Sequence, residues 1–185
     1  KLAKRWQRRL SRGLLLFAIY LIATLLIIPP LATRISSRVP LPLLEQNHLA
    51  PLNWIYPLAN RHYVKPELKL LMEEGALYMQ EKYPGTVLAY LDAGFPFIDE
   101  FPLLPHRSHD DGEKVDFCFL YKEKESGEQV HNKALTAMGY GGVEAPLQGE
   151  WDQIQHCVKK GHWQYDLLSR IAHPREDLAF DKERN

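Results

Sequence analysis

The chain has 185 residues, a formal net charge of zero and 45% hydrophobic residues, so it has room for one globular domain of ordinary size beyond a membrane segment. The charges are unevenly distributed along the sequence. Residues 1–12 contain six of the 23 Lys and Arg residues and no acidic residue, and the rest of the chain contains the other 17 Lys and Arg residues and all 23 Asp and Glu residues. The rest of the chain therefore carries about −6, which gives it no electrostatic reason to bind nucleic acid.

Residues 13–33 form an uncharged, largely apolar segment of 21 residues after this basic flank. As a helix rising about 1.5 Å per residue, the segment reaches across a hydrocarbon core of roughly 30 Å. A cleavable signal peptide has a shorter apolar stretch, and a buried core helix does not account for the flanking cations. We predict one transmembrane helix, with residues 1–12 in the cytoplasm and the remainder outside it by the positive-inside rule.

The remainder is predicted to be a connector followed by one α+β domain. Residues 34–65 are rich in proline and suggest a juxtamembrane connector that packs partly on the domain. In residues 66–185 the spacing of apolar residues predicts a small antiparallel sheet flanked by helices. The expected elements are a helix from Pro66 to Tyr83, strands at Thr86–Leu91 and Val115–Tyr121, and a helix from Trp151 to Ala172 interrupted at Gly161.

The two ends of the sequence suggest a fragment. The chain opens on Lys1 rather than Met, and residues 174–185 resemble the opening turns of a helix, so we expect truncation at the C-terminus. Cys118 and Cys157 allow one disulfide in an oxidising compartment, and two buried free thiols are an equal alternative.

The segment from His106 to Phe117 contains the residues best suited to chemistry. His109 and Asp116 are seven positions apart, joined by a turn at Gly112, with Asp116 at the start of an expected strand. Imidazole and carboxylate are ligands that suit Zn²⁺. Taken alone, the same residues also fit an ordinary Asp-Asp-Gly turn followed by a capping Asp.

This segment, H-x-S-H-x-x-G-x-x-V-D-F, resembles the first metal-binding motif of murein endopeptidases related to penicillin-insensitive endopeptidase. It is similar, more loosely, to the S-x-H-x-x-G-x-A-x-D motif of D-alanyl-D-alanine peptidases. The resemblance covers about residues 66–122 and implies a mixed α+β zinc peptidase fold. It also implies His109 and Asp116 as zinc ligands, a bacterial inner membrane, and peptidoglycan peptides as substrates.

Two parts of the family pattern are not matched directly. Dipeptidases carry an Arg-Pro pair after the first strand, where this chain has Gly94-Phe95-Pro96, and Arg107 is the candidate to bind substrate instead. A second motif, either Glu-x-x-His or His-x-His, supplies the third zinc ligand and a proton-transfer group in these families. Here the candidates for the third ligand are His162, His173 or a residue beyond Asn185, with His131 and His156 weaker.

The sequence thus leaves three interpretations. The first is a membrane-anchored zinc peptidase acting on the bacterial cell wall. The second is a non-catalytic envelope protein that binds wall peptide or a protein partner through the same domain. The third is a structural domain in which His109 and Asp116 belong to a hydrogen-bonded turn. A serine or cysteine hydrolase is disfavoured, because no Ser or Cys has the sequence context of a nucleophile.

Overall fold

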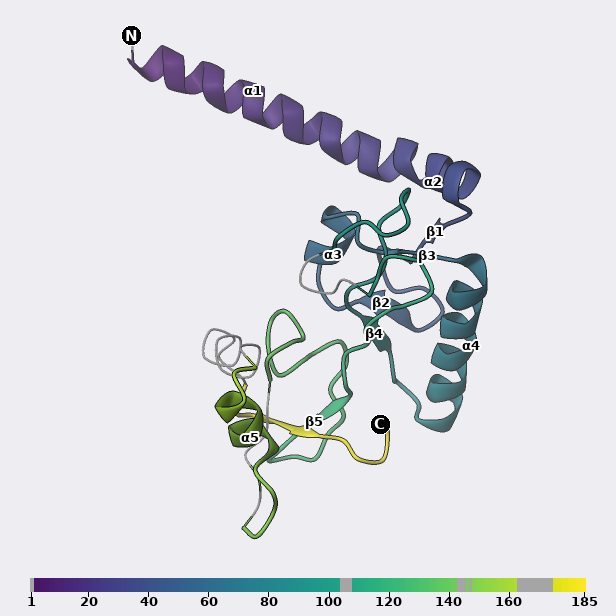
Figure 1. The fold of residues 1–185 in the computed structure, drawn as a ribbon, viewed down its shortest axis with the longest axis vertical. Helices are drawn as coiled ribbons and strands as arrows, with labels where there is room; N and C mark the ends of the chain where they lie inside the picture. Colours follow the sequence, from purple (N-terminus) through teal and green to yellow (C-terminus); the bar gives the residue numbers. More distant parts are fainter. Residues whose placement is uncertain (1, 104–107, 143–145, 147, 163–174) are drawn as a thin grey trace. The chain divides into compact units, whose positions relative to one another are not determined.

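A computed structural model describes residues 2–103, 108–142, 146, 148–162 and 175–185 (Figure 1). The chain divides into two compact units, each considered by itself below. Unit 1 comprises Lys1–Leu41, Trp54–Leu71 and Asp92–Val115. Unit 2 comprises Pro42–Asn53, Met72–Leu91 and Asp116–Asn185.

Unit 1 opens with a long helix that is continuous through three segments: α1 (Leu2–Ile22), the π-helical η1 (Ala23–Ile27) and α2 (Ile28–Ser36). The Pro29-Pro30 pair lies at the start of α2, directly after the π-helical turn, so the residues without an amide hydrogen fall where the hydrogen-bond pattern of the helix changes. Residues Lys4–Ser36 form one helix that is long and apolar enough to cross a membrane, and only 6% of its apolar window is buried. That exposure distinguishes it from a core helix and is compatible with a single-pass anchor or a signal sequence.

In the rest of unit 1, the residues that follow the long helix pack against the loop that begins at residue 92. Strand β1 (Val39–Pro40) pairs antiparallel with β3 (Tyr63–Val64), and the short helix α3 (Ile55–Leu58) lies between them in sequence. Tyr63 and Gly94 exchange both backbone hydrogen bonds, at 3.0 and 3.1 Å. A side chain at Gly94 would meet the Tyr63 carbonyl at 2.8 Å, which explains the glycine. Residues of the predicted connector therefore supply part of the buried core.

Unit 2 is built on two further strand pairs. Strand β2 (Leu49–Pro51) pairs in parallel with β4 (Leu88–Tyr90), and β5 (Tyr121–Glu123) pairs antiparallel with β6 (Leu178–Phe180). Helix α4 (Pro66–Lys82) is divided between the units, and α5 (Gln153–Lys159) belongs to unit 2. The Asp152 carboxylate accepts a hydrogen bond from the Gln155 amide and caps the start of α5.

The α+β class, the helix beginning at Pro66 and the strand near residues 86–91 are confirmed. The expected single antiparallel sheet is replaced, among the described residues, by three two-stranded pairs, one of which is parallel. The strand expected at Val115–Tyr121 is mostly irregular, although Phe117 bridges Tyr90. Its alternation is real: Phe117 and Phe119 are exposed, whereas Cys118 and Leu120 are buried.

The predicted helix at the C-terminus is wrong. Residues 178–180 form strand β6, because their backbone groups bond to β5, more than 50 positions earlier in the chain. Asn185 also pairs with the Leu120 backbone through both its side-chain oxygen and its side-chain nitrogen. Cys118 and Cys157 are free and buried, so this structure contains no disulfide between them.

Candidate metal centre

The loop that carries His109 is held by Arg38, a residue that sequence reasoning missed. The Arg38 side chain is fully buried and donates hydrogen bonds to the Phe95 carbonyl, the Asp99 carboxylate and, at 2.8 Å, the Asp110 carbonyl. One guanidinium therefore fixes both ends of residues 95–110. No local sequence signal identifies this role, since its partners lie 57 to 72 positions away.

Gly112 closes this loop against the same arginine. Its φ is +76°, a left-handed conformation that favours glycine, and a side chain there would meet the Arg38 Nε at 2.9 Å. The Gly112 carbonyl accepts a hydrogen bond from the Lys65 amide at 2.8 Å. The predicted need for backbone freedom at Gly112 is thus confirmed.

His109 lies beside a buried carboxylate, Asp92. The two residues are 5% and 1% exposed, and His109 Nδ1 is 3.9 Å from Asp92 Oδ2. This separation is too long for a hydrogen bond, but it is short enough for an electrostatic interaction between the imidazole and the carboxylate. Arg61 binds the Asp92 carboxylate in a bidentate manner: its Nε donates to Oδ1 at 2.6 Å, and its Nη2 donates to Oδ2. The bidentate pair compensates the burial of the carboxylate and fixes its direction.

Asp116 belongs to unit 2 and is positioned by backbone pairing with β4 and with Leu91 directly after it. Its carbonyl accepts from the Leu91 amide at 2.7 Å, and the next alternate residue, Cys118, donates to the Ala89 carbonyl at 2.8 Å. The Tyr140 hydroxyl donates to Asp116 Oδ2 at 2.5 Å. Tyr140, which lies between Gly139 and Gly141, therefore orients the carboxylate of the second predicted ligand.

The other predicted residues are less informative. His162 is exposed just beyond α5, where its amide donates to the Cys157 carbonyl. His173 and Arg107 lie outside the described residues. Within the part of the chain that the structure describes, no group of three or more His, Cys, Asp or Glu side chains is arranged to hold a metal ion.

Two Glu-x-x-His patterns were missed at the sequence level: Glu45 to His48 and Glu128 to His131. In the first, His48 Nδ1 lies 4.0 Å from the Glu45 carboxylate. In the second, both side chains are exposed on either side of a buried Val130. Each pattern belongs to unit 2, as does Asp116.

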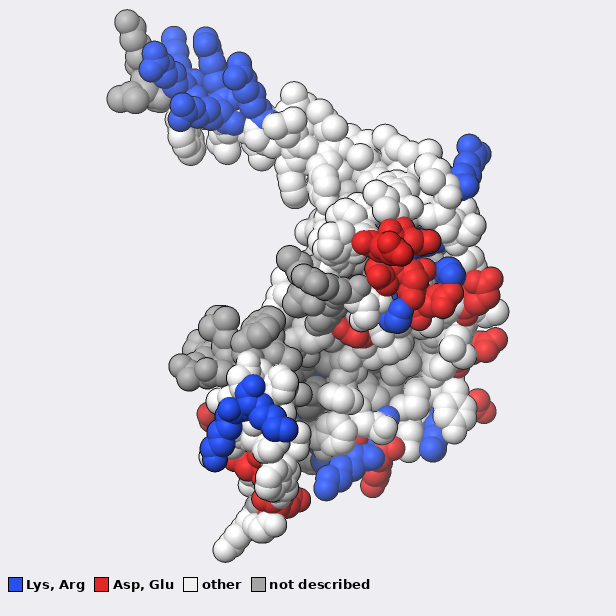
Figure 2. Space-filling model, viewed as in Figure 1, with Lys and Arg blue, Asp and Glu red and all other residues white. Residues whose placement is uncertain are grey.

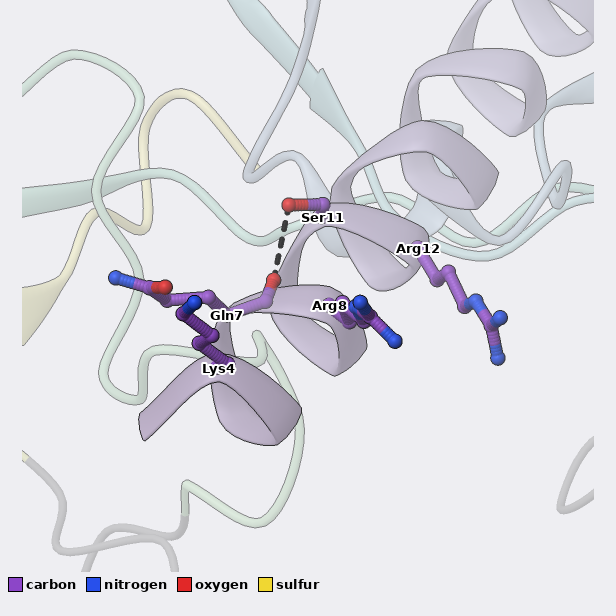
Figure 3. A pocket seen from close by; sticks show the side chains of 5 residues that line it. All are labelled: Lys4, Gln7, Arg8, Ser11 and Arg12. Carbon is purple, nitrogen blue, oxygen red and sulfur yellow. Dashed lines mark hydrogen bonds between the residues drawn. The ribbon is translucent and has the colours of Figure 1, made fainter. Parts of the chain in front are cut away.

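A separate hollow occurs on the first turns of α1 and is lined by Lys4, Gln7, Arg8, Ser11 and Arg12 (Figure 3). The Ser11 hydroxyl donates to the Gln7 carbonyl at 2.9 Å, a local bond within the helix. Every lining residue comes from this one exposed helix, so the hollow is part of the basic flank rather than an enclosed ligand site.

Comparison with known proteins assigns no family to the chain. Scans against protein-family models, curated proteins and solved structures each returned no match. The resemblance to zinc murein peptidases therefore remains a prediction from the segment around His109 and Asp116.

Proposed function

We propose that this chain is a membrane-anchored zinc peptidase of the bacterial cell envelope. Residues 13–33 cross the inner membrane, residues 1–12 remain in the cytoplasm, and the domain lies outside it. Its substrates are peptides of peptidoglycan, whose amide bonds it hydrolyses. His109 and Asp116 are two of its zinc ligands, with the third drawn from His162, His173 or a residue beyond Asn185.

The distribution of charge supports the anchoring. Figure 2 shows Lys and Arg gathered at the N-terminal end of the long helix, followed by a stretch without charge. Cations beside a membrane-spanning helix favour the cytoplasmic side and interact with its anionic lipids, at about 1 kcal/mol for each Lys or Arg near the surface. This asymmetry supports the orientation that we propose.

The observation that carries the metal assignment is the Arg61–Asp92–His109 arrangement. Histidine ligands of zinc usually have a carboxylate or carbonyl beside the ring nitrogen that does not bind the metal. Asp92 Oδ2 lies 3.9 Å from His109 Nδ1, longer than such a hydrogen bond, but a fixed carboxylate stands beside that ring nitrogen. We propose that Nε2, the other ring nitrogen, would bind the metal. Arg61 keeps the carboxylate in place, so the imidazole is oriented before any metal binds.

The residues of the chain then have distinct roles. Zinc, when bound, supplies a Lewis acid that activates water and polarises the scissile carbonyl. His109 and Asp116 would hold the ion, and the Tyr140 hydroxyl, which donates to Asp116 Oδ2, would orient that carboxylate. Arg107 is the proposed partner of the substrate carboxylate, since a guanidinium binds carboxylates in a bidentate manner.

The proposal is tested by digestion of purified peptidoglycan with the full chain, reconstituted in vesicles and supplied with zinc. We expect new free amino and carboxyl groups in the released peptides. Asp116→Asn should lower the rate by about 100-fold or more. Asp177→Asn is the matched control, because the Asp177 side chain forms an exposed ion pair with Arg175. Binding of peptidoglycan without cleavage would support the non-catalytic alternative instead.

A further inference from the structure

The long helix contacts the domain in the middle of its uncharged segment. The Tyr20 hydroxyl donates to the Leu58 carbonyl of α3. The Asn60 side-chain amide donates to the Tyr20 oxygen at 3.1 Å and to the Thr24 hydroxyl at 3.3 Å. Thr24 and Asn60 are both buried, at 4% and 5% exposed. These polar contacts, all inside unit 1, fix α3 beside the helix at the level of residues 20–24.

That level lies well below the membrane surface if the helix spans a bilayer. Thr24 is nine residues before Thr33, where the uncharged segment ends. At about 1.5 Å per residue this separation is roughly 14 Å, and Tyr20 is deeper by a further ~6 Å. Even a tilt of about 40° leaves Thr24 roughly 11 Å from the end of the segment. A bilayer that covers the uncharged segment must therefore also reach α3.

The composition of α3 suits lipid contact. Residues 54–60 (WIYPLAN) contain no charged side chain. Trp54 and Ile55 are 50% and 52% exposed, and Leu58 is exposed beside them. Tryptophan is enriched where proteins meet the membrane–water interface.

The backbone amides in the second half of this segment are paired internally, as a low-dielectric environment requires. The amides of residues 58–61 all donate to carbonyls of residues 54–57, and Pro57 has no amide hydrogen to satisfy. The Leu58 carbonyl, at the end of the short helix, accepts from Tyr20. Internal pairing of this kind is what lipid-exposed backbone requires.

From these contacts we infer that α3 is a second membrane contact, with Trp54, Ile55 and Leu58 inserted beside the helix into the leaflet on the domain's side. The inference rests on the anchoring in the proposed function and on no part of its peptidase chemistry. If α3 inserts in this way, part of the folded region is embedded in the bilayer, and the domain is not simply tethered to the membrane by a connector.

The test uses the full chain in phosphatidylcholine vesicles whose acyl chains carry bromine, a contact quencher of tryptophan. One variant keeps Trp54 alone, with Trp6, Trp151 and Trp163 changed to Phe. The matched variant keeps Trp151 alone, because this side chain of unit 2 is 69% exposed. We expect bromolipid to lower Trp54 emission about two-fold or more and to leave Trp151 emission almost unchanged.

Flotation of the vesicles separates the possible outcomes. If the chain does not float with the vesicles, the anchoring itself is wrong and the inference fails with it. If the chain floats but Trp54 emission responds to aqueous acrylamide and not to bromolipid, only the inference is overturned. Emission shielded from both quenchers would place a protein, such as a second copy of this chain, over α3, and would also overturn it.

Discussion

Replacing Arg38 with methionine tests how the loop that carries His109 is held. Methionine keeps much of the apolar stem but removes the guanidinium, which donates to two carbonyls and one carboxylate from a fully buried position. The loop would then lose the group that joins Phe95 to Asp110. We therefore expect loss of stability and a weaker hold on His109.

The three interactions do not contribute equally. The Asp99 side chain is 77% exposed, so its ion pair with Arg38 contributes at most about 1 kcal/mol. The carbonyls of Phe95 and Asp110 lose a charged donor, at roughly 1–3 kcal/mol each. Arg38→Met should therefore reduce the free energy of unfolding by about 2–7 kcal/mol, whereas Asp99→Asn should cost less than about 1 kcal/mol.

Thermal unfolding followed by circular dichroism in a mild detergent measures this difference. For a chain of this size, Arg38→Met should lower Tm by about 4–28 °C, and Asp99→Asn by no more than about 4 °C. Equal shifts in the two variants would refute the reasoning, because they would assign the stabilisation to the exposed ion pair. An unchanged Tm in Arg38→Met would refute it as well.

Three further predictions concern single positions. Gly112→Ala should destabilise the fold by at least about 1 kcal/mol more than Gly127→Ala. Both glycines have a positive φ, but only at Gly112 would the added methyl group meet another side chain, that of Arg38. Equal losses of stability in urea unfolding would contradict this prediction. Burial lowers the pKa of His62 from 6.5 to about 4, so stability is complete above pH 6.5 and falls as the pH drops towards 4. The loss between pH 7 and pH 5 should be about 2 kcal/mol and should vanish in His62→Leu, whereas a retained pH dependence would assign it to another group. Tyr140→Phe should weaken zinc binding about 10-fold in competition with a chromophoric chelator, and an unchanged affinity would remove Tyr140 from the support of Asp116.

Local patterns were sufficient to predict some elements. The helix from Pro66 was predictable because a proline at the first position and helical spacing of apolar residues act over a few neighbours. The strand at residues 88–90 follows from a short run of β-forming residues ahead of a Pro- and Gly-rich loop. The long N-terminal helix follows from the length of its uncharged run alone.

Elements that depend on distant pairing were not predictable in this way. Residues 178–180 carry no strong β signal, and β5 determines their conformation. The same limit applies to the candidate site. Asp92 is a single Asp after a strand, and nothing in the neighbouring sequence predicts that Arg61 binds its carboxylate or that His109 lies beside it. The motif therefore identified the two candidate ligands but not the residues that orient them.

The most direct test of the central claim is the zinc content of the full chain. Metal-free protein in detergent is dialysed against Zn²⁺ and analysed by mass spectrometry of the metal. We predict about one zinc per chain, lost in His109→Ala and in Asp116→Asn but retained in Asp177→Asn. Protein that takes up no zinc, or that binds it equally well without His109 and Asp116, would contradict the account.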